Sequence, residues 1–118
     1  MFVPITPIPK PRTTQRDRWA KRPIVVRYYD FCDELRLKYQ KPLPASFSLI
    51  FYIPMPKSWS NKKKSTMLGK PHQQRPDIDN LVKAVLDALC EDDSFVWNIE
   101  ACKLWSDKAG IDIEDFNG

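Results

Sequence analysis

The stretch Arg75-Pro76-Asp77-Ile78-Asp79-Asn80-Leu81-Val82-Lys83 is the part of the sequence from which we interpret the rest. It places two carboxylates one residue apart and a lysine four residues after the second. A further pair, Asp92-Asp93, follows after a single predicted helix. Carboxylates held close together repel one another unless a cation compensates their charge. Because Mg²⁺ binds oxygen ligands of this kind, the stretch indicates a magnesium site.

The backbone around the first two carboxylates follows from Pro76, which favours extended backbone just upstream. In an extended chain Asp77 and Asp79 point the same way, and Ile78 points opposite, toward the core. We expect Asp79 to be the N-cap of a helix over residues 81–89. The predicted buried face of this helix contains Leu81, Val82, Val85, Leu86 and Leu89. Its polar face contains Asp79, Lys83 and Asp87, each four residues from the next.

These residues suit reactions at a phosphodiester. Asp77, Asp79 and Asp93 would hold a magnesium ion, which would polarise a phosphoryl oxygen and help to generate an attacking hydroxide. Lys83 then stabilises the charge that develops on the phosphoryl group or the leaving oxygen. The alternative is purely structural: Asp79 is a helix cap, Lys83 is its i+4 partner, and Asp92-Asp93 is a polar turn.

The net charge of +4 conceals a strong asymmetry along the chain. Residues 1–22 carry +5 and residues 57–76 carry +6, whereas residues 77–118 carry −8. Two basic segments beside an acidic one predict a polyanionic ligand held next to the carboxylates. The alternative is that surface charges segregate without a function. The candidate DNA-binding residues are Lys10, Arg12, Lys57, Lys62, Lys63, Lys64, Lys70 and Arg75.

Length and composition are those of one globular domain spanning residues 1–118, with 42% hydrophobic and 29% charged residues. No apolar run is long enough to span a membrane, and prolines interrupt the N-terminal segment where a signal peptide would need an apolar core. We therefore expect a cytoplasmic protein. The three cysteines, Cys32, Cys90 and Cys102, lie in apolar surroundings and are expected to be buried free thiols.

The remaining pattern predicts an α+β fold, a small mixed sheet packed with two main helices. A proline-rich edge strand over residues 1–9 and a basic loop over residues 10–22 come first. A helix of about four turns then begins at Pro23 and ends before Pro42; its spacing predicts that Val25, Tyr28, Tyr29, Cys32, Leu35 and Tyr39 share its buried face. Residues 47–53 form a central strand covered on both faces. Residues 95–105 and 111–116 form strands that pair as a hairpin.

Residues 55–76 are predicted to be a long loop. Trp59 beside Lys62, Lys63 and Lys64 combines an aromatic face with phosphate-seeking ammonium groups, although a solvated lysine run is the alternative. Trp19 either stacks on a base or fills a hydrophobic gap. The only histidine, His72, is expected to be a surface residue or a minor ligand contact.

Arg75-Pro-Asp-Ile-Asp-Asn-Leu-Val-Lys-Ala-Val-Leu-Asp-Ala-Leu89, followed by Asp92-Asp93, resembles the RusA-type Holliday junction resolvases found in bacteria and their prophages. The family signature is Asp-x-Asp-Asn-Leu-x-Lys, a helix with Asp-Ala-Leu, and then Asp-Asp. The resemblance is good over residues 70–116, and further upstream it extends only to the order of elements. Only Cys90 and Glu91 separate Asp-Ala-Leu from Asp-Asp here, fewer residues than the family often has, which leaves open whether Asp92 or Asp93 faces the metal.

The resemblance implies a homodimeric, Mg²⁺-dependent endonuclease, with Mn²⁺ as a substitute, that cuts two strands of a four-way DNA junction symmetrically in recombination and repair. By position, Asp77, Asp79 and Asp93 match the metal-binding carboxylates, Lys83 matches the catalytic lysine, and Asp92 supports them. The alternatives are a nuclease for flaps, forks or Y-junctions, a branched-DNA-binding protein with a vestigial metal site, and an RNA-binding or structural phage component.

Overall fold

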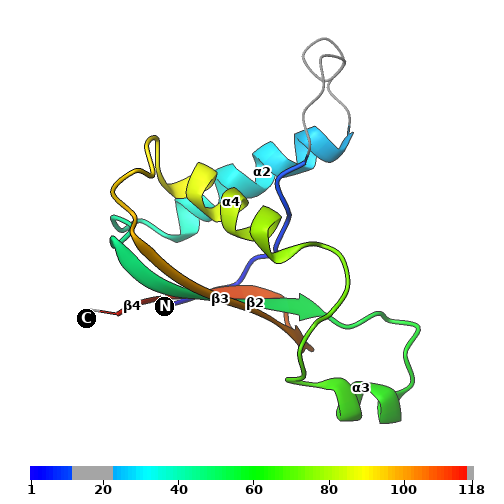
Figure 1. Ribbon diagram of the computed structural model, residues 1–118. Coiled ribbons are helices and arrows are strands. Elements are labelled where there is room, and N and C mark those ends of the chain that lie inside the picture. Colours follow the sequence, from blue (N-terminus) through cyan, green and yellow to red (C-terminus); the bar gives the residue numbers. More distant parts are fainter. Residues whose placement is uncertain (12–22, 117–118) are drawn as a thin grey trace.

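The computed structural model describes residues 1–11 and 23–116, which form a four-stranded mixed sheet in the order β1-β4-β2-β3. Two helices, α2 (Pro23–Lys38) and α4 (Ile78–Leu89), lie on one face of this sheet, and a short helix, α3 (Asn61–Met67), lies beyond its end (Figure 1). The α+β class and the mixed sheet are confirmed. Most of the predicted loop over residues 10–22, with Arg12 and Trp19, lies outside the described residues.

Strand β2 (Ser46–Pro54) is the centre of the sheet, as predicted. It pairs in parallel with β3 (Asn98–Ser106) and antiparallel with β4 (Gly110–Asp115). Phe47, Leu49 and Phe51 are almost fully buried toward the helices. Coverage of both faces was not confirmed: Ile50 and Tyr52 are only half-buried, because the described helices lie on one face of the sheet.

The predicted hairpin between the last two strands is wrong. Strand β4 pairs with β2 and β1, so β2 separates it from β3. Neighbouring strands lie about 4.8 Å apart, and the turn over residues 107–109 is long enough to cross the end of β2. The apolar β2 takes the central position because burial on both sides by neighbouring strands removes the most apolar surface from water.

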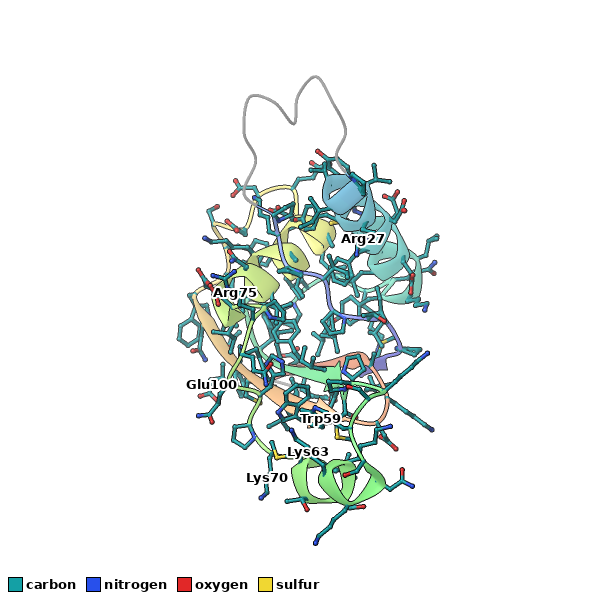
Figure 2. All side chains as sticks on the ribbon, turned by 90° about the vertical axis from the view of Figure 1, so that its right-hand side faces the viewer. Arg27, Trp59, Lys63, Lys70, Arg75 and Glu100 are labelled. Atoms are coloured by element: carbon teal, nitrogen blue, oxygen red, sulfur yellow. The ribbon has the colours of Figure 1, made fainter. Side chains whose placement is uncertain are left out.

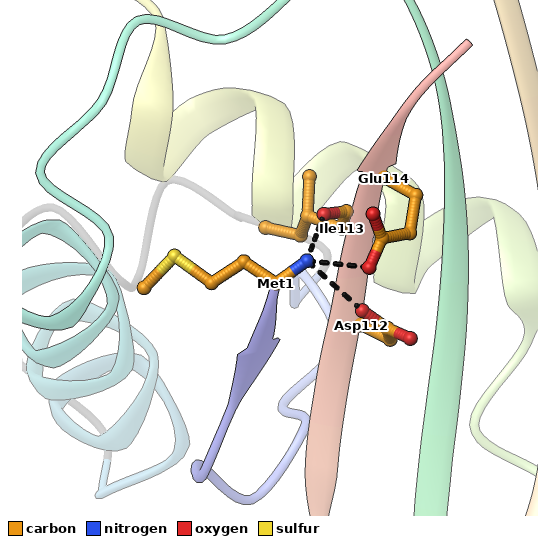
Figure 3. A network of polar contacts seen from close by, with 4 residues as sticks. All are labelled: Met1, Asp112, Ile113 and Glu114. Atoms are coloured by element: carbon orange, nitrogen blue, oxygen red, sulfur yellow. Dashed lines mark hydrogen bonds and ion pairs between the residues drawn. The ribbon is translucent and has the colours of Figure 1, made fainter. Parts of the chain in front are cut away.

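The proline-rich N-terminal segment forms a shorter edge strand than expected, β1 (Phe2–Val3), paired with β4. Proline lacks a backbone N–H, so Pro4 and Pro7 cannot extend the ladder. The amino group of Met1 donates to the Ile113 carbonyl at 2.7 Å and contacts the carboxylates of Glu114 and Asp112 (Figure 3). These contacts hold β1 on β4, and the two carboxylates raise the pKa of the amino group.

Helix α2 begins at Pro23, where the missing N–H costs nothing, and ends at Lys38 before Pro42. Val25, Tyr28, Cys32 and Leu35 are buried as predicted, as is Tyr39 just past the helix end. Tyr29 is 56% exposed, so its predicted place in the core is wrong. Arg36 of α2 donates to the backbone carbonyl of Ala88 at 2.7 Å, which ties α2 to α4.

The segment predicted to be a loop contains α3, and this corrects the expectation. The Ser60 hydroxyl accepts a hydrogen bond from the Lys63 N–H at 3.1 Å and caps the helix. None of its residues is fully buried, so it lacks the apolar periodicity that marks a helix in a sequence. Beyond α3, residues 69–72 run along one half of the outer edge of β3.

The three cysteines are free thiols in different surroundings. Cys32 is buried as expected and Cys90 is half-buried, whereas Cys102 is exposed because β3 turns it toward the sheet face that the described helices leave open. Among the described residues, no helix combines the length and the apolarity needed to cross a membrane.

Candidate functional site at the start of α4

The N-cap of α4 is Asp77 rather than Asp79. Its backbone is extended, with φ −70° and ψ 142°, and its carbonyl accepts from Leu81 N–H at 3.2 Å. The Asp77 carboxylate makes no capping hydrogen bond and is exposed. The helix therefore begins at Ile78, which is 37% exposed instead of entering the core. Pro76 restricts only the residue before it, so the chain can turn into the helix immediately after Asp77.

Asp79 lies in the first turn of α4, and Lys83 lies one turn further on. The Lys83 Nζ is 3.8 Å from a carboxylate oxygen of Asp79, as their four-residue spacing predicted. Both side chains are more than half exposed, so this pair contributes little to stability. Carboxylates at a helix N-terminus are favoured by the helix dipole. The described structure thus places Asp77, Asp79 and Lys83 on the first two turns of one exposed helix.

A pocket of about 550 Å³ opens beside Asp77. Its polar lining comes from Lys10, Arg75, Asp77 and Asn80, and Pro76 and three prolines of the N-terminal segment complete it. The Lys10 N–H donates to the Asn80 carbonyl at 3.0 Å, which holds that segment against α4. The pocket therefore places the Arg75 guanidinium, a group that suits contact with a phosphate, next to the Asp77 carboxylate.

The Lys10 ammonium forms an ion pair with Asp87, at 2.8 Å. Asp87 also accepts a hydrogen bond from the Tyr28 hydroxyl at 2.7 Å. Burial alone would raise the pKa of Asp87, but hydrogen bonds from Lys10 and Tyr28 lower it on balance. Asp87 is therefore a structural junction between the N-terminal segment, α2 and α4. Arg75 is the pocket cation whose guanidinium makes no ion pair with any described residue, and Figure 2 shows it beside α4.

Lys103 is a residue of this region that the sequence interpretation missed. From the middle of β3 its ammonium donates to the carbonyls of Gln74 at 2.7 Å and Pro76 at 2.8 Å. It fixes the chain immediately before Asp77 over the C-terminal half of β3. The position of Lys103 could have indicated this role. Lys103 is two residues before the buried Trp105, so both side chains lie on the same face of β3, and a charged residue on the core side of a strand needs a partner.

Asp92 and Asp93 lie beyond the opposite end of α4. Cys90 is the C-cap of the helix, and burial, with the nearby Asp93 carboxylate adding to it, raises the pKa of the Cys90 thiol. The Asp92 carboxylate accepts a hydrogen bond from Ser94 N–H at 2.9 Å, which lowers the pKa of Asp92. The 12 residues of α4 span about 18 Å, so this turn is far from Asp77.

The predicted set of three metal ligands, Asp77, Asp79 and Asp93, is consequently not assembled within one chain. Within residues 1–11 and 23–116, no three His, Cys, Asp or Glu side chains are grouped closely enough to hold a metal ion. The oxygen donors of Asp77 and Asp79 suit a hard cation such as Mg²⁺, but as a pair they leave a three-carboxylate site incomplete.

One of the basic residues before the site, Lys63, lies over a tryptophan that packs on a second tryptophan. Trp59 packs on Trp105 with ring centroids 4.7 Å apart, and the Lys63 ammonium lies 4.3 Å from the centroid of the Trp59 ring. Trp59 is therefore half-buried and anchors α3 to the sheet. Figure 2 shows Trp59 and Lys63 close together at the base of the molecule, with Lys70 on the side of β3. The further predicted DNA-binding residues Lys57 and Lys62 are exposed, and Lys64 is half-buried.

His72 is buried, which corrects the expectation of a surface position. It is 5% exposed and lies against Trp105, with ring centroids 4.4 Å apart. Its Nδ1 has no hydrogen-bond partner among the described residues. Burial, and then the charge of Lys103, lower the pKa of His72. Its neighbours in the sequence are polar, so no local pattern indicated this position.

Comparison with known proteins gives three results. A family model described as "Endodeoxyribonuclease RusA" matches residues 4–114, nearly the whole chain. The chain is also similar to "Uncharacterized protein YqaN" of Bacillus subtilis (strain 168), with 37% identity over 78 residues. That match covers 59% of this chain and 55% of the relative, so it spans little more than half the length of the relative. No solved structure matches.

Proposed function

The chain belongs to the RusA endodeoxyribonuclease family, and on that premise we propose that it is a structure-selective DNA endonuclease that resolves four-way junctions. In this proposal one protein, acting as a homodimer of single-domain chains, makes paired symmetric nicks during recombination and repair. The observation that carries the proposal is the family match over residues 4–114, which includes the whole Asp77 to Lys83 motif.

We propose Mg²⁺, or Mn²⁺ in its place, as the cofactor, with Asp77 and Asp79 as two of its ligands. Their exposure at one helix start and the free carboxylate of Asp77 support this assignment. When bound, such an ion supplies Lewis-acid chemistry at a phosphodiester. Lys83, whose ammonium lies 3.8 Å from Asp79, is the group we propose to stabilise negative charge on the phosphoryl group. Asp93 is the proposed third carboxylate, and Asp92 supports the turn that carries it.

DNA binding is assigned to the basic residues around this site. Arg75 lines the pocket beside Asp77 and suits bidentate contact with a phosphate. Lys57, Lys62, Lys63 and Lys64 extend the positive surface along α3 and the segment before it. Lys70 lies on the same side as Arg75 (Figure 2). Lys10 is the weaker candidate, because its ammonium is paired with Asp87.

A second candidate function is a branched-DNA-binding protein with a vestigial metal site. The separation of Asp93 from Asp77 along α4 within one chain favours it. Two features favour the nuclease: Lys83 is paired with Asp79, and the Asp77 carboxylate makes no capping hydrogen bond.

The deciding experiment is cleavage of a labelled, mobile four-way junction with Mg²⁺, Mn²⁺ or EDTA, beside linear duplex, single strand, flap and fork controls. We expect paired symmetric nicks on the four-way junction and only with metal. Equal or faster cleavage of flaps or forks would redirect the proposal to another branched substrate. Tight junction binding without cleavage in either metal would replace the nuclease with the binding protein.

A further inference from the structure

Lys103 is a charged residue on the core side of the sheet. In the parallel pairing of β2 with β3 it lies beside Phe51, which is fully buried. An ammonium in such a place is unfavourable unless its donors find acceptors. Lys103 forms no ion pair with any described carboxylate and donates instead to two backbone carbonyls, those of Gln74 at 2.7 Å and Pro76 at 2.8 Å. Its side chain is therefore committed to one segment of backbone.

The segment that Lys103 holds, residues 73–76, has little else to fix it. Within the described structure, none of its peptide groups forms a hydrogen bond to another backbone group. Residues 73–75 are exposed and Pro76 is half-buried, so burial does not fix the segment either. Backbone hydrogen bonds resume on both sides, at the His72 N–H, which donates to the Lys103 carbonyl at 3.0 Å, and at the Asp77 carbonyl. Lys103 thus bridges the gap between the sheet and the start of α4.

The hydrogen bond from Lys103 to the Pro76 carbonyl acts on the backbone of Asp77. That carbonyl belongs to the peptide group that joins Pro76 to Asp77, and a peptide group is planar. Fixing its oxygen therefore fixes the direction of the Asp77 N–H bond and limits the directions in which the Asp77 side chain can leave the backbone. The Asp77 carboxylate makes no capping hydrogen bond that would hold it in another way.

Two other roles for this lysine fit its contacts less well. A lysine that binds phosphate needs donors that are free to reach the ligand, but two of the three donors of Lys103 are already engaged with carbonyls. A lysine that only stabilises the fold would join buried elements, but residues 73–75, which Lys103 holds, are exposed. What this segment does carry is the connection to Asp77.

We propose that Lys103 is a positioning residue of the nuclease site, which holds Asp77 where its carboxylate can serve as a metal ligand. Lys103 itself contacts neither the metal nor the DNA and acts only through the peptide group between Pro76 and Asp77. The metal part of this inference rests on the proposed nuclease function. Removing a group that orients a metal ligand typically weakens metal binding by about 10- to 100-fold, which sets the size of the expected effect.

Lys103→Met tests this role, because methionine keeps an unbranched apolar side chain but cannot donate a hydrogen bond. Binding of Mn²⁺ to the protein without DNA is measured from the electron paramagnetic resonance signal of the free ion. The dissociation constant for Mn²⁺ is expected to rise by about 10- to 100-fold. The Mg²⁺ concentration at half-maximal junction cleavage should rise in parallel. Junction binding in EDTA is expected to match that of the wild type, because Lys103 does not contact DNA.

Lys108→Met is the matched control. Lys108 lies in the turn after β3, is exposed, and is not among the residues assigned to the site or to DNA binding. Both variants lose one positive charge, so a general electrostatic effect would appear in both, whereas only Lys103→Met is expected to weaken Mn²⁺ binding. Lys103→Gln, which has a shorter and neutral donor, is expected to weaken Mn²⁺ binding as well and takes the place of Lys103→Met if that variant does not fold.

A second measurement needs neither metal nor activity. The Leu81 N–H donates to the Asp77 carbonyl at 3.2 Å, so the hydrogen exchange of the Leu81 amide reports how firmly Asp77 is held. In metal-free Lys103→Met the Leu81 amide is expected to exchange several-fold faster than in the wild type, as measured by NMR. The amide of Val85, in the interior of α4, is expected to keep its rate and serves as the internal control.

Wild-type affinity for Mn²⁺ in Lys103→Met would overturn the positioning role, as would an unchanged exchange rate of the Leu81 amide. Weaker junction binding in EDTA would identify Lys103 as a DNA contact and would overturn the role as well. If the wild type binds metal but cuts no branched DNA, the proposed nuclease function fails, while the Mn²⁺ and exchange measurements still decide the role of Lys103. If the wild type binds no Mn²⁺, the proposed metal site fails, and the Leu81 exchange alone decides whether Lys103 holds Asp77.

Discussion

At the scale of single residues, the start of α4 has a carboxylate at the N-cap position that does not cap the helix. Asp77 occupies the N-cap position, yet its side chain makes no hydrogen bond to the helix. A cap that gives up its capping bond loses about 1 kcal/mol of helix stability, which is tolerated where the group serves another purpose. The Asp92 carboxylate, in contrast, accepts a hydrogen bond from the Ser94 N–H.

Asp77→Asn is therefore expected to fold normally and to lose cleavage, by about 100-fold or more, because it removes a metal ligand. DNA binding is expected to stay equal or become tighter, since a charge that repels phosphate is gone. Single-turnover cleavage and a binding titration in EDTA measure the two effects. Asp30→Asn, an exposed position on α2, is the control. Wild-type cleavage by Asp77→Asn would show that the metal assignment is wrong.

His72 predicts a pH dependence of stability. Its folded pKa lies below the ordinary value of 6.5, because burial and Lys103 disfavour the imidazolium. The unfolded state therefore binds the proton first as the pH falls through about 6.5, and the free energy of unfolding decreases until the folded pKa is reached. Above about pH 6.5 this loss is absent. Urea unfolding from pH 8 to pH 5 measures it.

His72→Phe is the matched variant, because a phenyl ring can keep the contact with Trp105 without titrating. Its free energy of unfolding is expected to fall less than that of the wild type between pH 7 and pH 5. Since the carboxylates titrate equally in both proteins, the difference between the two curves isolates His72. Parallel curves would mean that the imidazolium is accommodated in the fold.

At the scale of elements, α3 is a helix that faces water and carries charge. It has no fully buried residue, and its attachment depends on Trp59 and Met67, which pack against the core, and on the Ser60 cap. Its sequence, Asn-Lys-Lys-Lys-Ser-Thr-Met, places three lysines on about one turn. One of them, Lys63, already lies over the Trp59 ring, which fixes its direction. An ordered helix of this kind presents ammonium groups at defined positions.

Replacing Lys62, Lys63 and Lys64 with Ala is expected to weaken binding to all DNA sequences. The slope of log Kd against log salt concentration should fall by about 0.9 for each phosphate contact that is lost, and up to about three contacts can be lost. The control with an equal change of charge replaces Arg27, Lys38 and Lys41, which lie on or near α2. Titrations at several salt concentrations measure the slope. An unchanged slope in the α3 variant would exclude contact between α3 and DNA.

At the scale of the whole molecule, one layer of helices against one sheet face holds the fold together. The core contains the buried side of β2, the inner face of α2 and residues Leu81, Ala84 and Val85 of α4. Leu35 of α2 is fully buried at the centre of this layer, whereas Leu37, two residues later on the same helix, is 72% exposed. The same residue type therefore occurs at both extremes of burial on one helix.

Leu35→Ala is expected to lower the free energy of unfolding by about 2–5 kcal/mol, because it removes buried methyl groups and leaves a cavity. Leu37→Ala is expected to change it by less than about 0.5 kcal/mol. Urea denaturation of both variants, at one protein concentration, measures the contrast. Equal losses would mean that the packing of α2 against the sheet is not what stabilises the chain.

The sequence by itself determined the features that depend on neighbours a few residues apart. Helix α2 begins at Pro23, β2 follows its apolar run, and Lys83 meets Asp79 one turn away, because backbone restrictions and helical spacing act locally. The motif beginning at Asp77 likewise indicated the family that the whole-chain match then established.

Only the tertiary structure decided which distant segments meet. Strand β4 joined β2 instead of β3, His72 entered the core beside Trp105, and Lys103 found the carbonyl of Pro76. The same holds for the site: Asp79 and Asp93 belong to one sequence motif, but Asp79 lies in the first turn of α4 and Asp93 lies beyond the other end of this helix, which is about 18 Å long. Spacing along a sequence fixes separation along an element, whereas contact between elements depends on how all the apolar surfaces are buried together.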